Sequence, residues 1–172
     1  MDEDLRRRLA KRLEAVAARD AERIRQEREI AAVRREAAFE LYVICSNLVR
    51  SVNAIAGSAR LELSPSDYSP EFFRDSGPNL FQIGVSGRLV DIAFESTEAI
   101  LSTENFRTPY TLQGAVRWFS QESLESLGIR EHLLFCCLED GEGSWVWLDS
   151  VTHRTGPCDE DYLGGLLEEV LK

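Results

Sequence analysis

The sequence predicts an α+β fold: a long N-terminal helix, a mostly antiparallel sheet of about five or six strands, a short helix between the late strands, and a C-terminal helix. Three observations predict it. Residues 2–36 contain neither proline nor glycine, which favours a continuous helix, and this charged helix is expected to continue into an apolar core helix that begins near Ala37. Short apolar segments separated by turn residues fill much of 58–150. Apolar residues at helical spacing then close the chain.

Length and charge indicate one hydrophobic core with a charged extension. A chain of 172 residues is long enough for a single domain. We therefore expect a charged helical arm, residues 1–36, and a single acidic α+β head, residues 37–172. The arm has 11 basic and 9 acidic side chains, a net charge of +2, whereas the head has 9 basic and 21 acidic, a net charge of −12.

Within the arm, apolar residues are sparse and are separated by charged turns. We expect them to contact a partner or a second copy: Leu9, Leu13, Val16, Ile24 and Ile30. One row of small or apolar residues repeats every seven residues, but its companion row is interrupted by Asp20, Glu27 and Arg34. The arm is therefore a mixed-charge helix with weak coiled-coil character.

The helix from Ala37 to Ala56 should be the element on which the sheet packs. Its apolar residues follow one another at spacings of three and four, which places them on one helical face. Gly57 is expected to end this helix. The predicted buried face consists of Leu41, Ile44, Leu48, Val52 and Ile55.

Alternating apolar residues predict a first hairpin with a two-residue turn at 86–87. In that register Ile83 pairs with Val90 and Phe81 with Ile92, so both apolar rows lie on one face of the sheet.

The remaining elements follow from simpler patterns. A short strand is expected around 60–63, a long connection over 96–111 that can include a strand near 99–101, a strand over 112–119 and a short helix over 120–127. Residues 133–138 are all apolar, as in a strand covered on both faces. The expected second hairpin pairs Leu138 with Trp145 and Cys136 with Trp147. After a polar loop at 152–157, an acidic first turn at 159–161 begins the last helix.

Composition argues against several classes of protein. The charge of −10 disfavours general binding to nucleic acids or anionic membranes, which relies on basic side chains. The N-terminus lacks the apolar segment of a signal peptide, and no stretch has the roughly 18 apolar residues of a membrane helix. The four cysteines show no CxxC spacing. We expect buried thiols and a cytoplasmic location, and the excess of arginine, 18 against 2 lysines, is typical of a bacterial, GC-rich genome.

Candidate catalytic groups are few. Nucleophilic catalysis needs a thiol or hydroxyl beside a base, and the best available cluster is Asp149, His153 and Cys158. An ordinary polar connection explains the same residues. We assign no catalytic residues and favour a protein that is not an enzyme.

Candidate metal and cofactor sites are equally sparse. Three carboxylates, Glu139, Asp140 and Glu142, surround a hairpin tip, which either binds a hard cation or is a solvated turn. Gly84 and Gly87 do not form a phosphate-binding loop. We assign no metal or cofactor residues.

Trp145 and Trp147 share one face of their strand. Because two helices and two apolar sheet faces are expected, each face can be covered, and the two indoles then fill the core. The alternative is an aromatic patch that binds a partner, because tryptophan is enriched at binding hot spots.

The leading functional hypothesis is a non-catalytic accessory protein of the cytoplasm. Its arm would mediate self-association or docking to a partner protein, and its acidic head would supply recognition. One alternative is a small enzyme or ligand-binding domain with a pocket between the sheet and the long helix. Another is association with nucleic acid through the basic residues at the start of the arm: Arg6, Arg7, Arg8, Lys11 and Arg12.

Overall fold

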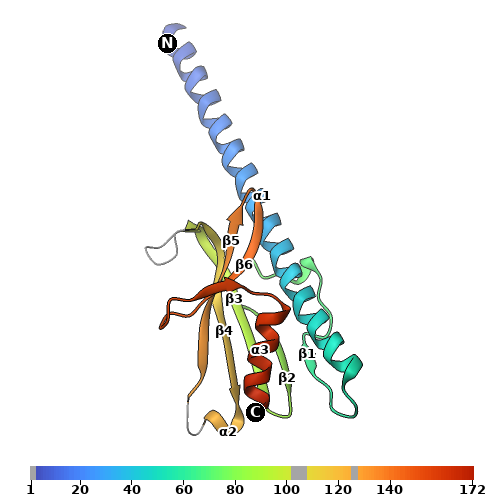
Figure 1. The fold of residues 1–172 in the computed structure, drawn as a ribbon. Coiled ribbons are helices and arrows are strands. Elements are labelled where there is room, and N and C mark those ends of the chain that lie inside the picture. Colours follow the sequence, from blue (N-terminus) through green and yellow to red (C-terminus); the bar gives the residue numbers. More distant parts are fainter. Residues whose placement is uncertain (1–2, 102–107, 125–127) are drawn as a thin grey trace. The chain divides into compact units, whose positions relative to one another are not determined.

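The computed structural model of the protein describes residues 3–101, 108–124 and 128–172, and it confirms the α+β fold. The chain divides into two compact units, Met1–Ala32 and Val33–Lys172. From here on, the arm and the head mean these two units, whose boundary lies four residues before the one expected from the sequence. Figure 1 shows the elements in order: α1 (Glu3–Ile55), β1 (Glu62–Ser64), the 3-10 helix η1 (Pro70–Phe72), β2 (Asn79–Val85), β3 (Arg88–Leu101), β4 (Tyr110–Ser120), α2 (Gln121–Leu124), β5 (Arg130–Glu139), β6 (Glu142–Leu148), β7 (Thr155–Pro157) and α3 (Glu160–Leu171).

The described strands form one open antiparallel sheet in which every strand lies beside its neighbours in sequence, from β1 to β7. The sheet has seven strands rather than five or six. The additional strand is β7, which lies in the segment expected to be a polar loop. Its three residues are too few to show an alternating pattern, and only their pairing with β6 identifies them as a strand.

The first hairpin has the predicted register, with Ile83 opposite Val90 and Phe81 opposite Ile92. Strand β3 is longer than expected and continues to Leu101, because it pairs with β4 through residues that the sequence indicated as a connection. Residues 102–107 and 125–127, in the expected connection and short helix, lie outside the described residues.

The predicted register of the second hairpin is wrong by two residues. Cys136 pairs with Trp145, and Leu134 pairs with Trp147. The turn consists of Asp140 and Gly141, both with positive φ (51° and 80°), which is the conformation of a tight two-residue hairpin turn. A shift of two residues keeps each side chain on its predicted face.

Both long helices of the head pack on the same face of the sheet, not one on each face. The core joins the buried side of α1 and α3 to alternate residues of the strands. This covered face includes Phe81, Ile92, Val116, Leu134 and Trp145, and α3 adds Leu163, Leu166, Leu167 and Val170. The opposite face of the sheet, hereafter the open face, has no helix of the described residues over it.

The buried side of α1 is shorter than predicted. Leu41 and Leu48 are buried as expected, but Val52 is 39% exposed and Ile55 is 89% exposed. The last turns of α1 are instead held by polar contacts: the Asn53 amide donates to the Leu61 carbonyl at 2.9 Å and accepts from the Leu61 N–H at 2.8 Å.

At its other end, the head's part of α1 is anchored by Arg34. Its guanidinium donates to the Thr111 hydroxyl at 2.7 Å and to the Thr97 carbonyl at 2.7 Å. The sequence pattern treated Arg34 as a polar interruption of an apolar row. The structure shows why a polar residue is needed there, since it binds main-chain and hydroxyl oxygens of β3 and β4.

Candidate functional site

Strand register places the side chains of the open face in three parallel rows that cross the strands. The apolar row runs from β2 to β6 and consists of Leu80, Ala93, Ala115, Leu133 and Leu148. A charged row on one side consists of Gln82, Asp91, Arg117 and Glu131. A mixed row on the other side consists of Glu95, Gln113, Phe135 and Val146.

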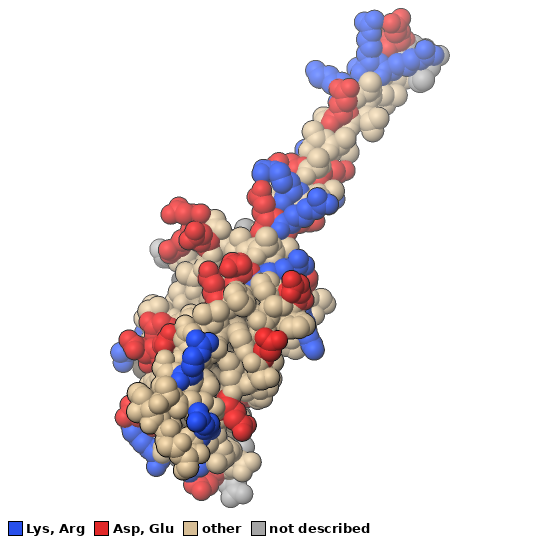
Figure 2. All heavy atoms as spheres, turned by 90° about the vertical axis from the view of Figure 1, so that its right-hand side faces the viewer, with Lys and Arg blue, Asp and Glu red and all other residues tan. Residues whose placement is uncertain are grey.

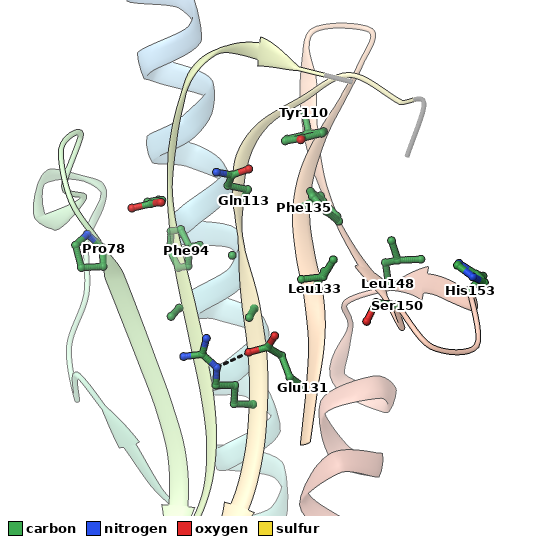
Figure 3. Close-up of a pocket in the computed structure, with 15 residues that line it drawn as sticks. Pro78, Phe94, Tyr110, Gln113, Glu131, Leu133, Phe135, Leu148, Ser150 and His153 are labelled. Carbon is green, nitrogen blue, oxygen red and sulfur yellow. Dashed lines mark hydrogen bonds and ion pairs between the residues drawn. The ribbon is translucent and has the colours of Figure 1, made fainter. Parts of the chain in front are cut away.

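The apolar row forms the floor of a groove, hereafter the open-face groove. Two pockets, of about 630 Å³ and about 800 Å³, meet in it and share Pro78, Ala93, Ala115 and Arg117. Figure 3 shows α1 behind the strands and the lining side chains in front of them, with Pro78 at one end and His153 at the other. The small side chains of Ala93 and Ala115, opposite one another on β3 and β4, leave the centre of the sheet face hollow.

Gly114 of β4 allows close contact between β3 and β4 beneath the floor of the groove. A Cβ at this position would collide with the main-chain carbonyl oxygen of Ala93 and with the Cα of Phe94. Only glycine therefore lets β3 and β4 approach so closely at the centre of the groove.

Charged groups occupy the edge of the groove. The Arg117 guanidinium lies 2.5 Å from the Glu131 carboxylate, and the Gln82 amide donates to Asp91 at 2.9 Å. Burial raises the pKa of the Asp91 carboxyl, and the hydrogen bond from Gln82 and the charge of Arg117 oppose this rise. With Glu95 on the other side, the two edges carry three carboxylates and one guanidinium. The groove is therefore apolar along its floor and net acidic along its edges.

One end of the groove contains a small second core on the open face. Tyr110 and Phe135 pack with ring centroids 4.8 Å apart, and Cys137 and Leu148 are buried beside them. This packing explains why residues 133–138 are apolar without interruption, since β5 is buried on both faces at this position.

The groove does not lie where the ligand-binding hypothesis expected a pocket. That hypothesis put the pocket between the sheet and the long helix. In the described residues this space holds packed aromatic side chains: the Phe81 and Phe94 rings are 5.5 Å apart, and the Phe94 and Trp145 rings are 5.0 Å apart.

A second cluster of polar and aromatic residues lies on the covered face, where α3 meets β5 and β6. The Nδ1 of His132 is 2.9 Å from the Tyr162 hydroxyl, and its Nε2 is 3.9 Å from the Asp149 carboxylate. The Trp147 ring stacks on both His132 and Tyr162, with centroids 5.0 Å apart in each pair. Trp118 contacts the edge of His132 and donates from its indole N–H to Glu169 at 2.8 Å.

The chemistry of this cluster favours holding α3 in place over catalysis. Burial lowers the pKa of His132, although the charges of Asp149 and Glu169 oppose this effect. Burial also raises the pKa of Tyr162 well above its usual value, so its hydroxyl stays protonated at neutral pH and is a poor nucleophile. His132 and Tyr162 are 30 residues apart, and no spacing in the sequence indicated that they meet.

The sequence suggested Asp149, His153 and Cys158 as a catalytic cluster. In the structure these three side chains have different environments. Asp149 accepts hydrogen bonds from its own loop, including the Thr152 hydroxyl at 2.6 Å. His153 is exposed and lies in the turn with a positive φ of 59°. Cys158 is buried in the core, and burial raises the pKa of its thiol to about 12, which keeps it protonated.

The other three cysteines are also buried free thiols. Burial raises the pKa of Cys136 to about 12 and that of Cys137 to about 11, so neither is an activated nucleophile. The acidic hairpin tip of Glu139, Asp140 and Glu142 is exposed. Within the described residues, no group of three or more His, Cys, Asp or Glu side chains is arranged to hold a metal ion.

The two tryptophans of β6 have different environments. Trp145 is 5% exposed, and its indole N–H donates to the Ala37 carbonyl of α1 at 2.7 Å, so it belongs to the core. Trp147 is half-buried in the His132 cluster. Both point to the covered face, as the alternation predicted.

The arm keeps its apolar side chains exposed. Leu9, Leu13, Val16 and Ile24 are exposed, as is Leu5, and only Ile30 is half-buried. Between them, Arg25 forms ion pairs with Glu22 at 2.6 Å and Glu29 at 2.9 Å, and Figure 2 shows acidic and basic side chains interleaved along this unit. The stripe of Leu5, Leu9, Leu13, Val16 and Ile24 is hereafter the arm stripe.

Comparisons of the chain with protein-family models, with curated proteins and with solved structures find no match. In the described part of the chain, no helix is both long and apolar enough to cross a membrane.

Proposed function

We propose that this protein is a non-catalytic interaction protein of the cytoplasm, which self-associates through its arm and recognises a partner through its head. The observation that carries the proposal is the arm stripe. Its five apolar side chains are 39% to 70% exposed on a helix whose other residues are mostly charged residues and alanine. Exposed apolar side chains aligned on one helical face gain free energy when a partner covers them.

The arm needs such a partner for its own stability. Its ion pairs join exposed residues within one or two helical turns, and each contributes only a few tenths of a kcal/mol. Helices that lack tertiary packing are marginal in water, so association would stabilise the arm. The head supplies a recognition surface in the open-face groove, and four free thiols are compatible with a reducing cytoplasm.

The test is the solution mass of the full chain, measured by light scattering over a range of concentrations. We expect the wild type to be a multimer and the double variant Leu9→Glu/Leu13→Glu to be monomeric, because two buried carboxylates would oppose association. The matched control is Ala15→Glu/Ala18→Glu, which adds the same charge on the other side of the helix and should retain the wild-type mass. A wild type that stays monomeric at every concentration contradicts the proposal.

A second candidate function is the binding of a small molecule in the head. The pocket of about 630 Å³ has a volume typical of small-molecule sites. Its apolar floor and charged edge would accept an apolar compound with one polar group. A screen of such compounds for an increase in the melting temperature of the head tests this candidate, and Ala115→Leu, which fills the hollow, should abolish the effect.

A further inference from the structure

The described residues leave two apolar surfaces at least partly exposed: the arm stripe, and the open-face groove, whose floor exposes Leu80 and, in part, Ala93 and Leu133. We infer that the open-face groove of one molecule binds the arm stripe of a second copy of this chain. The inference rests on the proposed self-association, and it makes a second copy of this chain the partner that the groove of the head recognises.

The dimensions of the two surfaces agree. The apolar row crosses five strands, whose four spacings of about 4.8 Å give a floor about 19 Å long. From Leu5 to Val16 a helix rises about 16 Å, at 1.5 Å per residue. The charged and mixed rows are four residues apart along β3 and β4, about 13 Å, which admits a helix of about 10–12 Å diameter.

The charges of the two surfaces are complementary. Residues 5–16 carry five basic side chains and one acidic side chain. Helical periodicity places Arg6 and Arg12 on the two sides of the arm stripe. The groove presents Asp91 and Glu131 at one edge, with Arg117 between them and paired with Glu131, and Glu95 at the other edge, so its edges remain net acidic. Basic residues that flank an apolar stripe would thus meet acidic residues that flank an apolar floor.

A second copy of the chain is an occupant with the matching shape and charge. Helix α1 is continuous from Glu3 to Ile55, and association between two copies leaves this helix intact in each. One short helix buries a small interface, so the association should be weak and dependent on concentration.

The first test uses substitutions in the groove of the full chain. Ala93→Arg fills the hollow and adds a positive charge opposite the basic arm, and we expect it to weaken self-association by about tenfold or more in Kd. Leu80→Arg is the second variant, because Leu80 is 47% exposed and the change should not affect folding. The matched control is Ile129→Arg, at a position 51% exposed and outside the groove, which should leave Kd unchanged.

The second test is complementation between defective variants. Leu9→Glu/Leu13→Glu has an intact groove and a defective arm, whereas Leu80→Arg has an intact arm and a defective groove. Each should be monomeric alone, but an equimolar mixture should form a one-to-one heterodimer through one intact arm and one intact groove. Sedimentation velocity with a fluorescent label on one variant measures this.

The outcomes separate the two proposals. If the groove variants associate as the wild type does while the arm variant is monomeric, the arms bind one another or another surface, and this inference is overturned while the proposed self-association stands. If the arm variant also keeps the wild-type mass, both are overturned. Loss of association in the groove variants without complementation in the mixture also overturns binding of the arm in the groove.

Discussion

We expect His132 to couple the docking of α3 to pH. Burial lowers its pKa, and it faces Tyr162 on one side and Asp149 on the other, with Glu169 nearby. The unfolded chain, with an ordinary histidine pKa of about 6.5, then binds a proton more readily than the folded head. The contribution of His132 to the free energy of unfolding is therefore complete above about pH 6.5 and decreases as the pH falls below it.

We expect the urea midpoint of the wild type to fall between pH 7.5 and pH 5.5, and His132→Gln to lose less stability over the same interval. The exposed His153 provides the control, because His153→Gln should keep the wild-type pH dependence. Equal pH dependence in wild type and His132→Gln would show that another group is responsible.

At pH 7.5, Tyr162→Phe should lower the free energy of unfolding by about 1 kcal/mol through the loss of one hydrogen bond.

Gly114 is the glycine on which the geometry of the groove depends most. A methyl group there would collide with main-chain atoms of β3, which cannot move aside as a side chain can. We expect Gly114→Ala to lower the free energy of unfolding by about 3 kcal/mol or more. In contrast, Gly165→Ala in α3 meets no atom within 4 Å and should raise stability by about 1 kcal/mol, because alanine favours helix. Denaturant unfolding of both variants measures the difference, and equal effects would contradict this account.

At the scale of elements, local patterns in the sequence predicted most of the fold. The absence of proline and glycine before Gly57 predicted α1. The alternation of apolar residues around 86–87 predicted the first hairpin and its register, and the acidic turn at 159–161 predicted α3. The second register was wrong although the Asp140-Gly141 pair, a strong signal for a tight turn, was present. Strand β7 was not predicted because its three residues are too few to show an alternating pattern.

The groove could not be predicted in the same way. Ala93 and Ala115 are small residues on consecutive strands, and only the register of β3 with β4 places them opposite one another. Periodicity shows which residues share a face but not which face a helix covers. The sequence therefore suggested two covered faces, whereas α1 and α3 share one and leave the apolar row open.

At the scale of the whole molecule, the two units should unfold separately. Helix residues 3–29 are all exposed, so the arm lacks the tertiary packing that makes unfolding cooperative. All three tryptophans, Trp118, Trp145 and Trp147, belong to the head. Tryptophan fluorescence thus reports on the head alone, whereas circular dichroism at 222 nm reports on both units.

We expect the circular dichroism signal of a dilute sample to begin to fall at a lower temperature than the fluorescence signal. At higher concentration, association should bring the two transitions closer together. The variant Leu9→Glu/Leu13→Glu should keep the wide separation at every concentration. Coincident transitions in dilute wild type would show that the arm is stabilised by something other than association.

The order of strands in the sheet, which repeats the order of the chain, has a consequence for folding kinetics. Each strand pairs with the next one along the chain, so the contact order of the sheet is low and its hairpins can form rapidly one after another. The distant contact is the docking of α1, where the Trp145 indole reaches Ala37 across 108 residues. Closure of that long loop should limit the folding rate, and the burial of Trp145 is the event that reports it.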